Sequence, residues 1–200
     1  MKFIDLNAQQ KKIRDRVDKR INRVLNHGKY IMGPEVFELE EALAEHVGVK
    51  YCISCSSGTD ALLIPLMAKG IGPGDAVITT TFTYIATAEV ISLLGATPVF
   101  VDIYPETFNI NVSQIQNAVD DIKKNNLIPK AIIAVDLFGL PARYRLLEII
   151  AKENKLFLIQ DSAQGFGSSI RNKKSGGFGD VASTSFFPAK PLGCYGDGGA

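Results

Sequence analysis

Apolar side chains recur at helical spacing near the start of the chain. Between residues 7 and 26 they stand three or four positions apart, and His27-Gly28 then supplies a stop. A second helix is expected to open at Gly33-Pro34 and to end at Gly48. The apolar positions are Ile13, Val17, Ile21, Val24 and Leu25 in the first helix and Val36, Leu39, Leu43 and Val47 in the second.

From residue 49 onward the pattern changes to short β-rich runs, most of them separated by helical stretches. We expect strands at 49–55, 76–80, 97–102, 131–137, 156–161 and 181–186. Several runs are apolar at consecutive positions, which is typical of parallel strands covered on both faces. The pattern therefore predicts a three-layer α/β/α sandwich around a mostly parallel sheet. We expect residues 1–200 to form one domain, with the helices of 7–47 packed on it.

Composition and charge favour a small-molecule function. The chain has 22 Lys and Arg against 21 Asp and Glu, with no long block of one sign. This balance lacks the electrostatic footprint of a nucleic-acid or polybasic membrane binder. The first residues lack the apolar centre of a secretory signal, and no apolar run approaches the ~20 residues that cross a bilayer. We expect a cytoplasmic protein.

The three cysteines give little support for a metal or redox site. Cys52 and Cys55 lie in a predicted strand, where residues three positions apart point to opposite faces. Cys194 is remote in sequence, and no second Cys pair or Cys/His cluster accompanies them. No metal is expected.

Polar residues gather directly after the predicted strands, where doubly wound sheets bind their ligands. Segment 56–60, Ser-Ser-Gly-Thr-Asp, follows the first strand and leads into a helix whose free N–H groups could hold a phosphate. The alternative is an ordinary serine N-cap without a ligand, and this segment alone favours that alternative.

Two aromatic residues follow the strand at 76–80. One of them could stack on a flat heterocycle, although core packing explains either ring equally well. We expect Phe82 in the core, and Tyr84, with its hydroxyl, in a half-polar pocket.

The strand at 156–161 is apolar until it ends at Gln160-Asp161. The Asp161 carboxylate should therefore emerge at the rim of the core, where an unpaired charge costs several kcal/mol. Its partner is either a helix N-terminus or the cationic ring nitrogen of a cofactor, and the residues alone leave both open. Gln164 can reach the same place.

Lys190 stands between Ala189 and Pro191 in a segment without other basic residues. A surface-loop lysine is the simplest interpretation, but the three preceding clusters point to the same edge of the sheet. An amine withdrawn from water there would be nucleophilic toward an aldehyde.

In this order, the segments resemble the DegT/DnrJ/EryC1/StrS sugar aminotransferases, members of the fold-type I pyridoxal-phosphate enzymes. The resemblance spans essentially the whole chain. Its elements are FIDL at 3–6, GPEV at 33–36, SGTDAL at 57–62, GPGD at 72–75, FTY at 82–84, DSAQ at 161–164 and SFFPAK at 185–190.

The resemblance implies roles for the residues at this edge. Lys190 would hold pyridoxal 5′-phosphate covalently and later move a proton between the substrate carbon and the cofactor. Asp161 would pair with the pyridinium nitrogen and keep it protonated. Gln164 would contact the ring hydroxyl, and Tyr84 would stack on the ring face.

The resemblance also implies a phosphate site. Backbone amides around Gly58, Thr59 and Asp60 would hold the phosphate together with the Ser185 hydroxyl. The family forms homodimers with shared active sites and has a smaller C-terminal domain. Because the chain stops just after a predicted loop, we expect it to be truncated before that domain, and we expect the 200-residue fragment alone to be inactive.

The implied reaction is a ping-pong transfer in which an amino acid, usually glutamate, gives its amino group to a nucleotide-linked keto sugar. Some relatives carry histidine in place of the lysine and act as dehydratases, whereas this chain keeps Lys190. Segments 51–55 and 185–199 look most like enzymes that aminate C3 of a UDP-2-acetamido-3-keto-hexuronic acid, for lipopolysaccharide or O-antigen synthesis. The alternatives are a dTDP- or GDP-linked 4-keto sugar aminotransferase and a non-catalytic sugar-nucleotide binding or regulatory protein.

Overall fold

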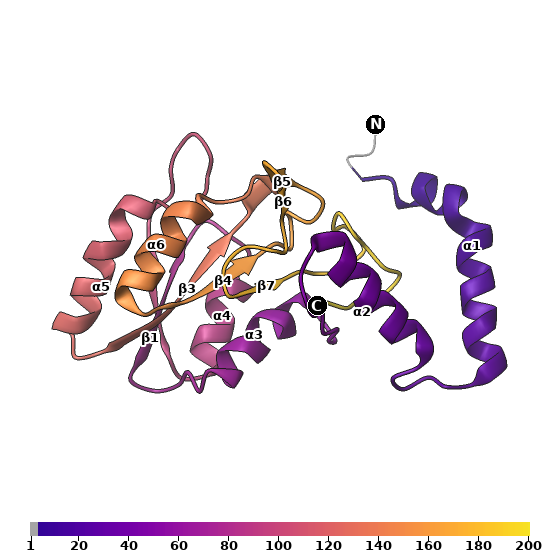
Figure 1. Cartoon of the computed structure of the whole chain (residues 1–200), viewed down its shortest axis with the longest axis horizontal. Helices are drawn as coiled ribbons and strands as arrows, with labels where there is room; N and C mark the ends of the chain where they lie inside the picture. The colour runs from indigo at the N-terminus through magenta and orange to yellow at the C-terminus, as the bar shows by residue number, and fades with distance from the viewer. Residues whose placement is uncertain (1–3) are drawn as a thin grey trace. The chain divides into compact units, whose positions relative to one another are not determined.

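Two helices make up most of the first unit of the structure, a computed structural model that describes residues 4–200. Phe3 of the FIDL segment lies outside the described residues. The chain divides into the units Met1–Ser54 and Cys55–Ala200. The first holds α1 (Leu6–His27) and α2 (Pro34–Val47), each followed by a left-handed glycine as the sequence predicts (Figure 1). The expected packing of these helices on the sheet stays a prediction.

A five-stranded parallel sheet forms the centre of the second unit, in the order β2-β1-β3-β4-β7. The strands are β1 (Asp75–Thr80), β2 (Thr97–Val101), β3 (Ile128–Val135), β4 (Phe157–Asp161) and β7 (Val181–Ser183). The chain runs outward from β1 to β2 and then returns to place β3 on the other side of β1. This reversal is the kind of switch point at whose carboxyl edge ligands bind.

Helices cover both faces of the sheet (Figure 1). On one face, α5 (Ile115–Lys124) and α6 (Tyr144–Asn154) pack over Ile78, Ile132 and Leu158. On the other face, α3 (Gly58–Ala68) and α4 (Ala86–Leu93) pack over residues that include Ile133 and Ile159. Neighbours such as Ile132 and Ile133 point to opposite cores because side chains alternate along a strand. The predicted three-layer sandwich is confirmed.

The predicted strand at 49–55 is wrong. Within this segment only Cys55 forms a β-bridge, an isolated antiparallel one to Gly199. One residue earlier, the Ser54 N–H and hydroxyl both donate to the Glu40 carboxylate at 2.7 Å. A side chain therefore takes the hydrogen bond that a neighbouring strand would otherwise accept, and β-rich composition alone cannot reveal this.

Phe82 is also not in the core, contrary to the prediction. Its side chain is 44% exposed, and its ring lies 5.4 Å from that of Phe108 and 6.3 Å from that of Phe138. The three rings come from the loops that follow β1, β2 and β3. They pack on one another at the carboxyl edge of the sheet. Phe82 therefore contacts aromatic rings of neighbouring loops instead of being buried between the sheet and a helix.

The remaining elements are short connections around the sheet. The strand predicted to reach residue 186 ends at Ser183, and Ser185 instead forms a bridge with Gly199. A small hairpin that the sequence pattern did not predict precedes β7. The hairpin consists of β5 (Ser169–Ile170) and β6 (Lys173–Lys174). The other short elements are the 3-10 helices η1 (Val112–Gln114) and η2 (Leu137–Gly139).

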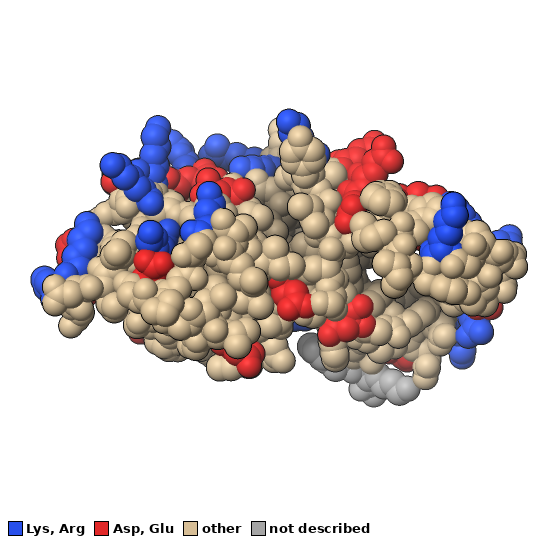
Figure 2. Space-filling view, turned by 90° about the horizontal axis from the view of Figure 1, so that it is seen from below, with Lys and Arg blue, Asp and Glu red and all other residues tan. Residues whose placement is uncertain are grey.

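Charged side chains of both signs are interspersed on the face shown in Figure 2. This agrees with the near balance of charge along the sequence, a net +1. Within residues 4–200, no helix is long and apolar enough to span a bilayer. The face in view therefore has the mixed charge that the composition indicates.

Candidate functional site

The polar residues selected from the sequence all lie in the second unit, at or beside the carboxyl edge of the sheet. Asp161 is the last residue of β4, and Gly58 is the first residue of α3. Ser185 follows β7 and pairs with Gly199, which in turn pairs with Cys55 just before α3. This pairing brings the segment after β7 to the N-terminus of α3, although the two are more than a hundred residues apart in sequence.

Asp161 is a buried carboxylate whose hydrogen-bond donors are neutral. It is 5% exposed and accepts from the Thr87 hydroxyl at 3.0 Å and from the Ala163 N–H at 3.1 Å. Burial raises the pKa of the Asp161 carboxyl, while these donors and the charge of Lys190 act in the opposite direction. A carboxylate in this setting favours an additional cation close to it.

Lys190 lies in a turn of the segment that follows β7. Its backbone N–H donates to the Phe187 carbonyl at 2.8 Å, and its side chain is half-buried. The ends of the segment are joined where Phe186 N–H donates to the Gly198 carbonyl at 2.7 Å. The sheet edge thus anchors the loop that carries the amine, and the amine charge acts on Asp161.

Gln164 is held by a backbone donor from the neighbouring loop. Its Oε1 accepts the Phe138 N–H at 2.8 Å, and its side chain is half-buried. Because Gln164 follows β4 and Phe138 follows β3, this bond joins two adjacent loops at the carboxyl edge. The amide is therefore held beside the strand that ends in Asp161.

The N-terminus of α3 packs directly against Ser185. A Cβ atom on Gly58 would lie 2.5 Å from the Ser185 Cβ, so only glycine permits this approach. A Cβ on Gly199 would lie 2.3 Å from the Ser57 carbonyl oxygen. Bare backbone at both positions brings the first turn of α3 against the Ser185 segment.

The first turn of α3 has a serine N-cap, as one of the two sequence interpretations proposes. Ser57 Oγ accepts the Asp60 N–H at 3.1 Å, and the Asp60 carboxylate accepts the Ser56 hydroxyl. The Asp60 amide is therefore already bonded within the turn. The N–H groups of Gly58 and Thr59 have no intrahelical acceptor and are the ones that can meet an anion.

Tyr84 lies outside the core of the second unit. It is 67% exposed, and its carbonyl accepts the Thr87 N–H at 3.2 Å as α4 begins. The helix start thus fixes its backbone beside the Thr87 hydroxyl, which bonds Asp161. Its stacking on a cofactor stays a prediction.

Sequence reasoning missed two sets of residues at this edge. Thr87 was not selected, although it bonds Asp161 and lies 3.3 Å from the Thr83 hydroxyl. The i, i+4 threonine pair is a weak signal that could have indicated it. Asp136 was also missed, and its position directly after an apolar strand is the same signal that selected Asp161.

The chemical groups of these residues fit those of pyridoxal phosphate. Asp161 supplies a buried carboxylate with neutral donors, which suits a protonated ring nitrogen. The first turn of α3, brought against Ser185, suits a phosphate. Lys190 supplies an amine whose charge acts on the same carboxylate. Carboxylate, anion site and amine are the groups that this cofactor requires.

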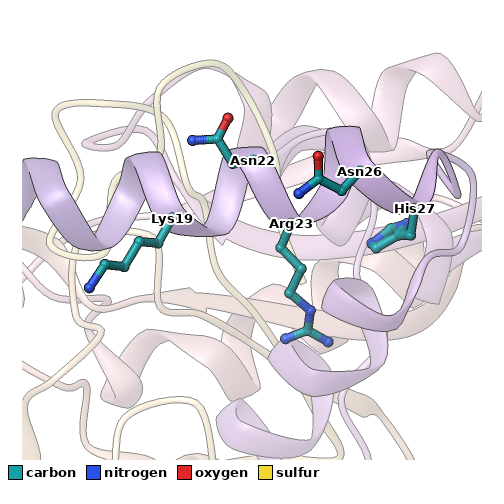
Figure 3. Close-up of a pocket in the computed structure, with 5 residues that line it drawn as sticks. All are labelled: Lys19, Asn22, Arg23, Asn26 and His27. Carbon is teal, nitrogen blue, oxygen red and sulfur yellow. The ribbon is translucent and has the colours of Figure 1, made fainter.

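A separate hollow in the first unit is lined from a single helix, α1 (Figure 3). Its lining residues are Lys19, Asn22, Arg23, Asn26 and His27. Two of them are already paired, because Arg23 contacts Glu35 at 3.1 Å and Glu38 at 2.5 Å, and His27 contacts Glu35 at 3.2 Å. The hollow therefore lies beside the ion-pair network that joins α1 to Glu35 and Glu38 of α2.

None of the three cysteines, all of which lie within residues 4–200, forms a disulfide. Cys52 and Cys55 flank a non-strand segment, so their expected placement on opposite faces of a strand does not apply. Cys55 Sγ donates to the Ser57 carbonyl at 3.3 Å. Across residues 4–200, no group of three or more His, Cys, Asp and Glu side chains could hold a metal ion.

Residues 11–200 match the DegT/DnrJ/EryC1/StrS aminotransferase family. The chain is 54% identical over 200 residues to a UDP-2-acetamido-2-deoxy-3-oxo-D-glucuronate aminotransferase of Pseudomonas aeruginosa, covering 100% of this chain and 54% of the relative. It is 42% identical over 197 residues to a pleiotropic regulatory protein of Geobacillus stearothermophilus, covering 98% and 51%. The chain thus spans about half the length of these relatives.

Solved structures show the same similarity. A DegT/DnrJ/EryC1/StrS aminotransferase from Brucella abortus superposes with a TM-score of 0.98 at 53% identity, covering 100% of this chain and 54% of that one. NtdA from Bacillus subtilis, solved with bound cofactor PMP, superposes with a TM-score of 0.88 at 31% identity, covering 100% and 44%. The fold and the resemblance noted in the sequence are confirmed.

We expect Asp161→Asn to stabilise the cofactor-free protein at neutral pH. An acid whose pKa is raised by folding stabilises the fold below its unfolded pKa, and this contribution is lost as pH rises through the folded pKa. At pH 7 the Asp161 carboxyl therefore costs stability that an amide, which does not titrate, does not cost. Thermal unfolding should show a higher Tm for the variant, with the difference shrinking as pH falls below the raised pKa.

The control for this experiment is Asp120→Asn, a substitution of an exposed residue of α5, which should not raise Tm at pH 7. A lower Tm for Asp161→Asn at pH 7 would contradict the interpretation of Asp161 as a destabilising buried charge.

Proposed function

The chain belongs to the DegT/DnrJ/EryC1/StrS aminotransferase family, and from this premise we propose that the protein is a pyridoxal-phosphate-dependent aminotransferase acting on a nucleotide-linked keto sugar. One observation carries the proposal. The buried Asp161 carboxylate has neutral hydrogen-bond donors, and the positive charge of Lys190 acts to lower its pKa against the effect of burial. A structural N-cap does not require a second charged group of this kind, whereas cofactor chemistry does.

Lys190 and Asp161 divide the chemical work in this proposal. Pyridoxal phosphate, when bound, supplies an electrophilic aldehyde and a conjugated ring that accepts an electron pair. Lys190 Nζ is the amine that holds the cofactor and then carries the proton to and from the substrate carbon. The Asp161 carboxylate, oriented by the Thr87 hydroxyl, keeps a proton on the ring nitrogen.

Other residues of the edge bind and orient the cofactor in this proposal. The N–H groups of Gly58 and Thr59 and the Ser185 hydroxyl hold the phosphate, while the Asp60 amide closes the N-cap. Tyr84 stacks on the ring face, and Gln164 contacts the ring hydroxyl. These assignments rest on the family resemblance together with the placement of each residue beside Asp161 or α3.

The proposed substrate is a UDP-linked 2-acetamido-3-keto-hexuronic acid, aminated at C3 with glutamate as donor. It is supported by the 54% identity to the P. aeruginosa aminotransferase named for a UDP-2-acetamido-2-deoxy-3-oxo-D-glucuronate. Amination at C4 of a dTDP- or GDP-linked sugar is the rival within the family. A product of this kind would serve bacterial surface polysaccharide synthesis.

We further propose that the whole protein is a cytoplasmic homodimer with shared active sites. In this proposal, residues 1–200 form the cofactor-binding domain with the helices of 7–47 packed on it, and a smaller domain accompanies it. The relatives are about twice as long as this chain, which supports the additional domain. In the first unit, exposed apolar side chains such as Ile31, at 89%, support contact with further protein.

A regulatory role is the second candidate, because the G. stearothermophilus relative is named a pleiotropic regulatory protein. A regulator that only binds a sugar nucleotide has no need of a reactive amine at position 190. The need for the Lys190 amine therefore distinguishes the two candidate functions. The other residues of the site that fit pyridoxal phosphate favour the enzyme.

We expect Lys190→Ala to abolish amino transfer in the whole protein. Without the Nζ amine, nothing attaches the cofactor or returns the proton to the substrate carbon. Absorbance spectra of the protein with pyridoxal phosphate, before and after glutamate, should change for wild type and not for the variant. The matched control is Lys123→Ala, at an exposed residue, which should behave as wild type.

A glutamate-dependent spectral change in Lys190→Ala would contradict the role assigned to Lys190. A wild-type protein that binds the sugar nucleotide but shows no glutamate-dependent spectral change would favour the regulatory role.

We expect Gly58→Ala to weaken pyridoxal phosphate binding by about tenfold or more. The added Cβ would collide with Ser185 at 2.5 Å and push the first turn of α3 away from it. Titration of the cofactor by absorbance measures the loss. Gly72→Ala is the control, because its Cβ would meet only the Leu94 carbonyl at 3.7 Å. Unchanged affinity in Gly58→Ala would remove this turn from the phosphate site.

We expect the whole protein to prefer the UDP-linked 3-keto-hexuronic acid over dTDP- and GDP-linked 4-keto sugars. A site that hydrogen-bonds one arrangement of oxygens discriminates by at least about a hundredfold in kcat/KM against another arrangement. Single-substrate assays with glutamate as donor give these ratios. Higher kcat/KM for a 4-keto sugar would replace the proposed substrate and leave the aminotransferase itself intact.

A further inference from the structure

Asp136, which follows β3, is a second buried carboxylate at the carboxyl edge. It is 0% exposed and receives four hydrogen bonds. The Tyr144 and Ser175 hydroxyls donate at 2.6 Å, Gln160 Nε2 at 2.7 Å and the Ala142 N–H at 3.2 Å. Burial raises the pKa of the Asp136 carboxyl, and the three side-chain donors act in the opposite direction. A fully bonded network of this kind holds its members rigidly.

This network adjoins the strand end that carries Asp161. The Asp136 N–H donates to the Asp161 carbonyl at 2.9 Å. The turn after β4 also packs on Asp136, because a Cβ on Gly165 would lie 2.6 Å from the Asp136 Cβ and 2.7 Å from its Oδ2. Asp136 therefore contacts both Asp161 and the turn in which Gln164 lies.

The loop after Asp136 begins with a strained turn, and the Asp136 carboxylate closes the far end of this loop. Its first part is held by Gly139 N–H donating to the Asp136 carbonyl at 3.2 Å, and its end by Ala142 N–H donating to Oδ1 at 3.2 Å. Within the first part, between Asp136 and Gly139, Phe138 has φ 54° and ψ 20°. A bulky residue rarely adopts this left-handed conformation and does so where its surroundings impose it.

The strained turn presents one specific group to Gln164. The Phe138 N–H donates to Gln164 Oε1 at 2.8 Å, which identifies the oxygen end of the amide. An amide has an accepting oxygen and a donating nitrogen, so the remaining end, Nε2, can only donate. The oxygen on a pyridoxal ring is an acceptor that such a donor satisfies.

We propose that Asp136 is a positioning residue: by closing the loop that carries Phe138, its carboxylate fixes the Gln164 amide so that Nε2, rather than Oε1, is offered to the cofactor ring oxygen. This inference rests on the proposed function. Asp136 itself touches neither cofactor nor substrate in this scheme. It acts through Phe138, whose left-handed backbone is what turns the N–H toward Gln164.

The first test measures hydrogen exchange at the Phe138 amide without cofactor. In either orientation, the amide of Asp136→Asn places its NH2 group against an N–H donor, Gln160 Nε2 or Ala142 N–H, which opposes two donors and loosens the loop. Exchange at Phe138 should accelerate by about tenfold. Thr79→Val is the matched control, since it removes a buried bond to the Ile133 carbonyl on the central strands and should leave Phe138 unchanged. Exchange at Phe138 as slow as in wild type would overturn the proposal.

The second test measures binding of pyridoxal phosphate by absorbance titration. Asp136→Asn should weaken binding by about tenfold, and Thr79→Val should not. Gln164→Glu keeps an oxygen for the Phe138 N–H but replaces Nε2 with a negative oxygen, so it should weaken binding equally while exchange at Phe138 stays slow. Wild-type affinity in Gln164→Glu would overturn the assigned amide orientation.

A milder variant covers the case in which Asp136→Asn fails to fold. Tyr144→Phe removes one donor to Asp136 and keeps the ring that stacks 4.7 Å from Phe178. It should change exchange and affinity in the same direction by a smaller factor, and no change in either would overturn the proposal. A wild type that binds no pyridoxal phosphate would overturn the proposed function, while exchange at Phe138 would still decide the link from Asp136 to the turn.

Discussion

Burial of two carboxylates at the ends of adjacent apolar strands is the constraint on which the carboxyl edge depends. Asp136 and Asp161 both have pKa values raised by burial, so each needs donors or a cation around it. Asp136 obtains four donors from the protein itself, and Asp161 obtains two neutral ones. The protein itself therefore surrounds the Asp136 carboxylate with donors, whereas the Asp161 carboxylate has only two and can accept further ones.

The strand order explains how residues distant in sequence reach this edge together. Because every pairing in the sheet is parallel, all strands end on the same side, and each following loop starts beside its neighbours. Gly58 and Gly199 then allow backbone segments to approach more closely than side chains would permit. Local sequence places each polar residue at a strand end, and sheet topology brings those ends together.

The sequence predicted the strands, the layers and the family, because these depend on periodicity and on ordered motifs that span the chain. It could not predict that segment 49–55 lacks a strand partner, since the Ser54 donors are taken by the side chain of Glu40. Phe82 was misassigned because hydrophobicity does not separate core rings from rings that pack among loops. The roles of Thr87 and Asp136 depend on contacts between distant residues, which no local pattern contains.

The exposed rings of Phe82, Phe108 and Phe138 carry a thermodynamic consequence. All three remain partly in water, with Phe138 at 70%, although each packs on the other two. Water around exposed apolar rings contributes a high heat capacity, so the heat capacity falls when the rings are covered. Any molecule or chain segment that covers this trio must therefore bind with a negative heat-capacity change, so its binding enthalpy becomes more favourable as temperature rises.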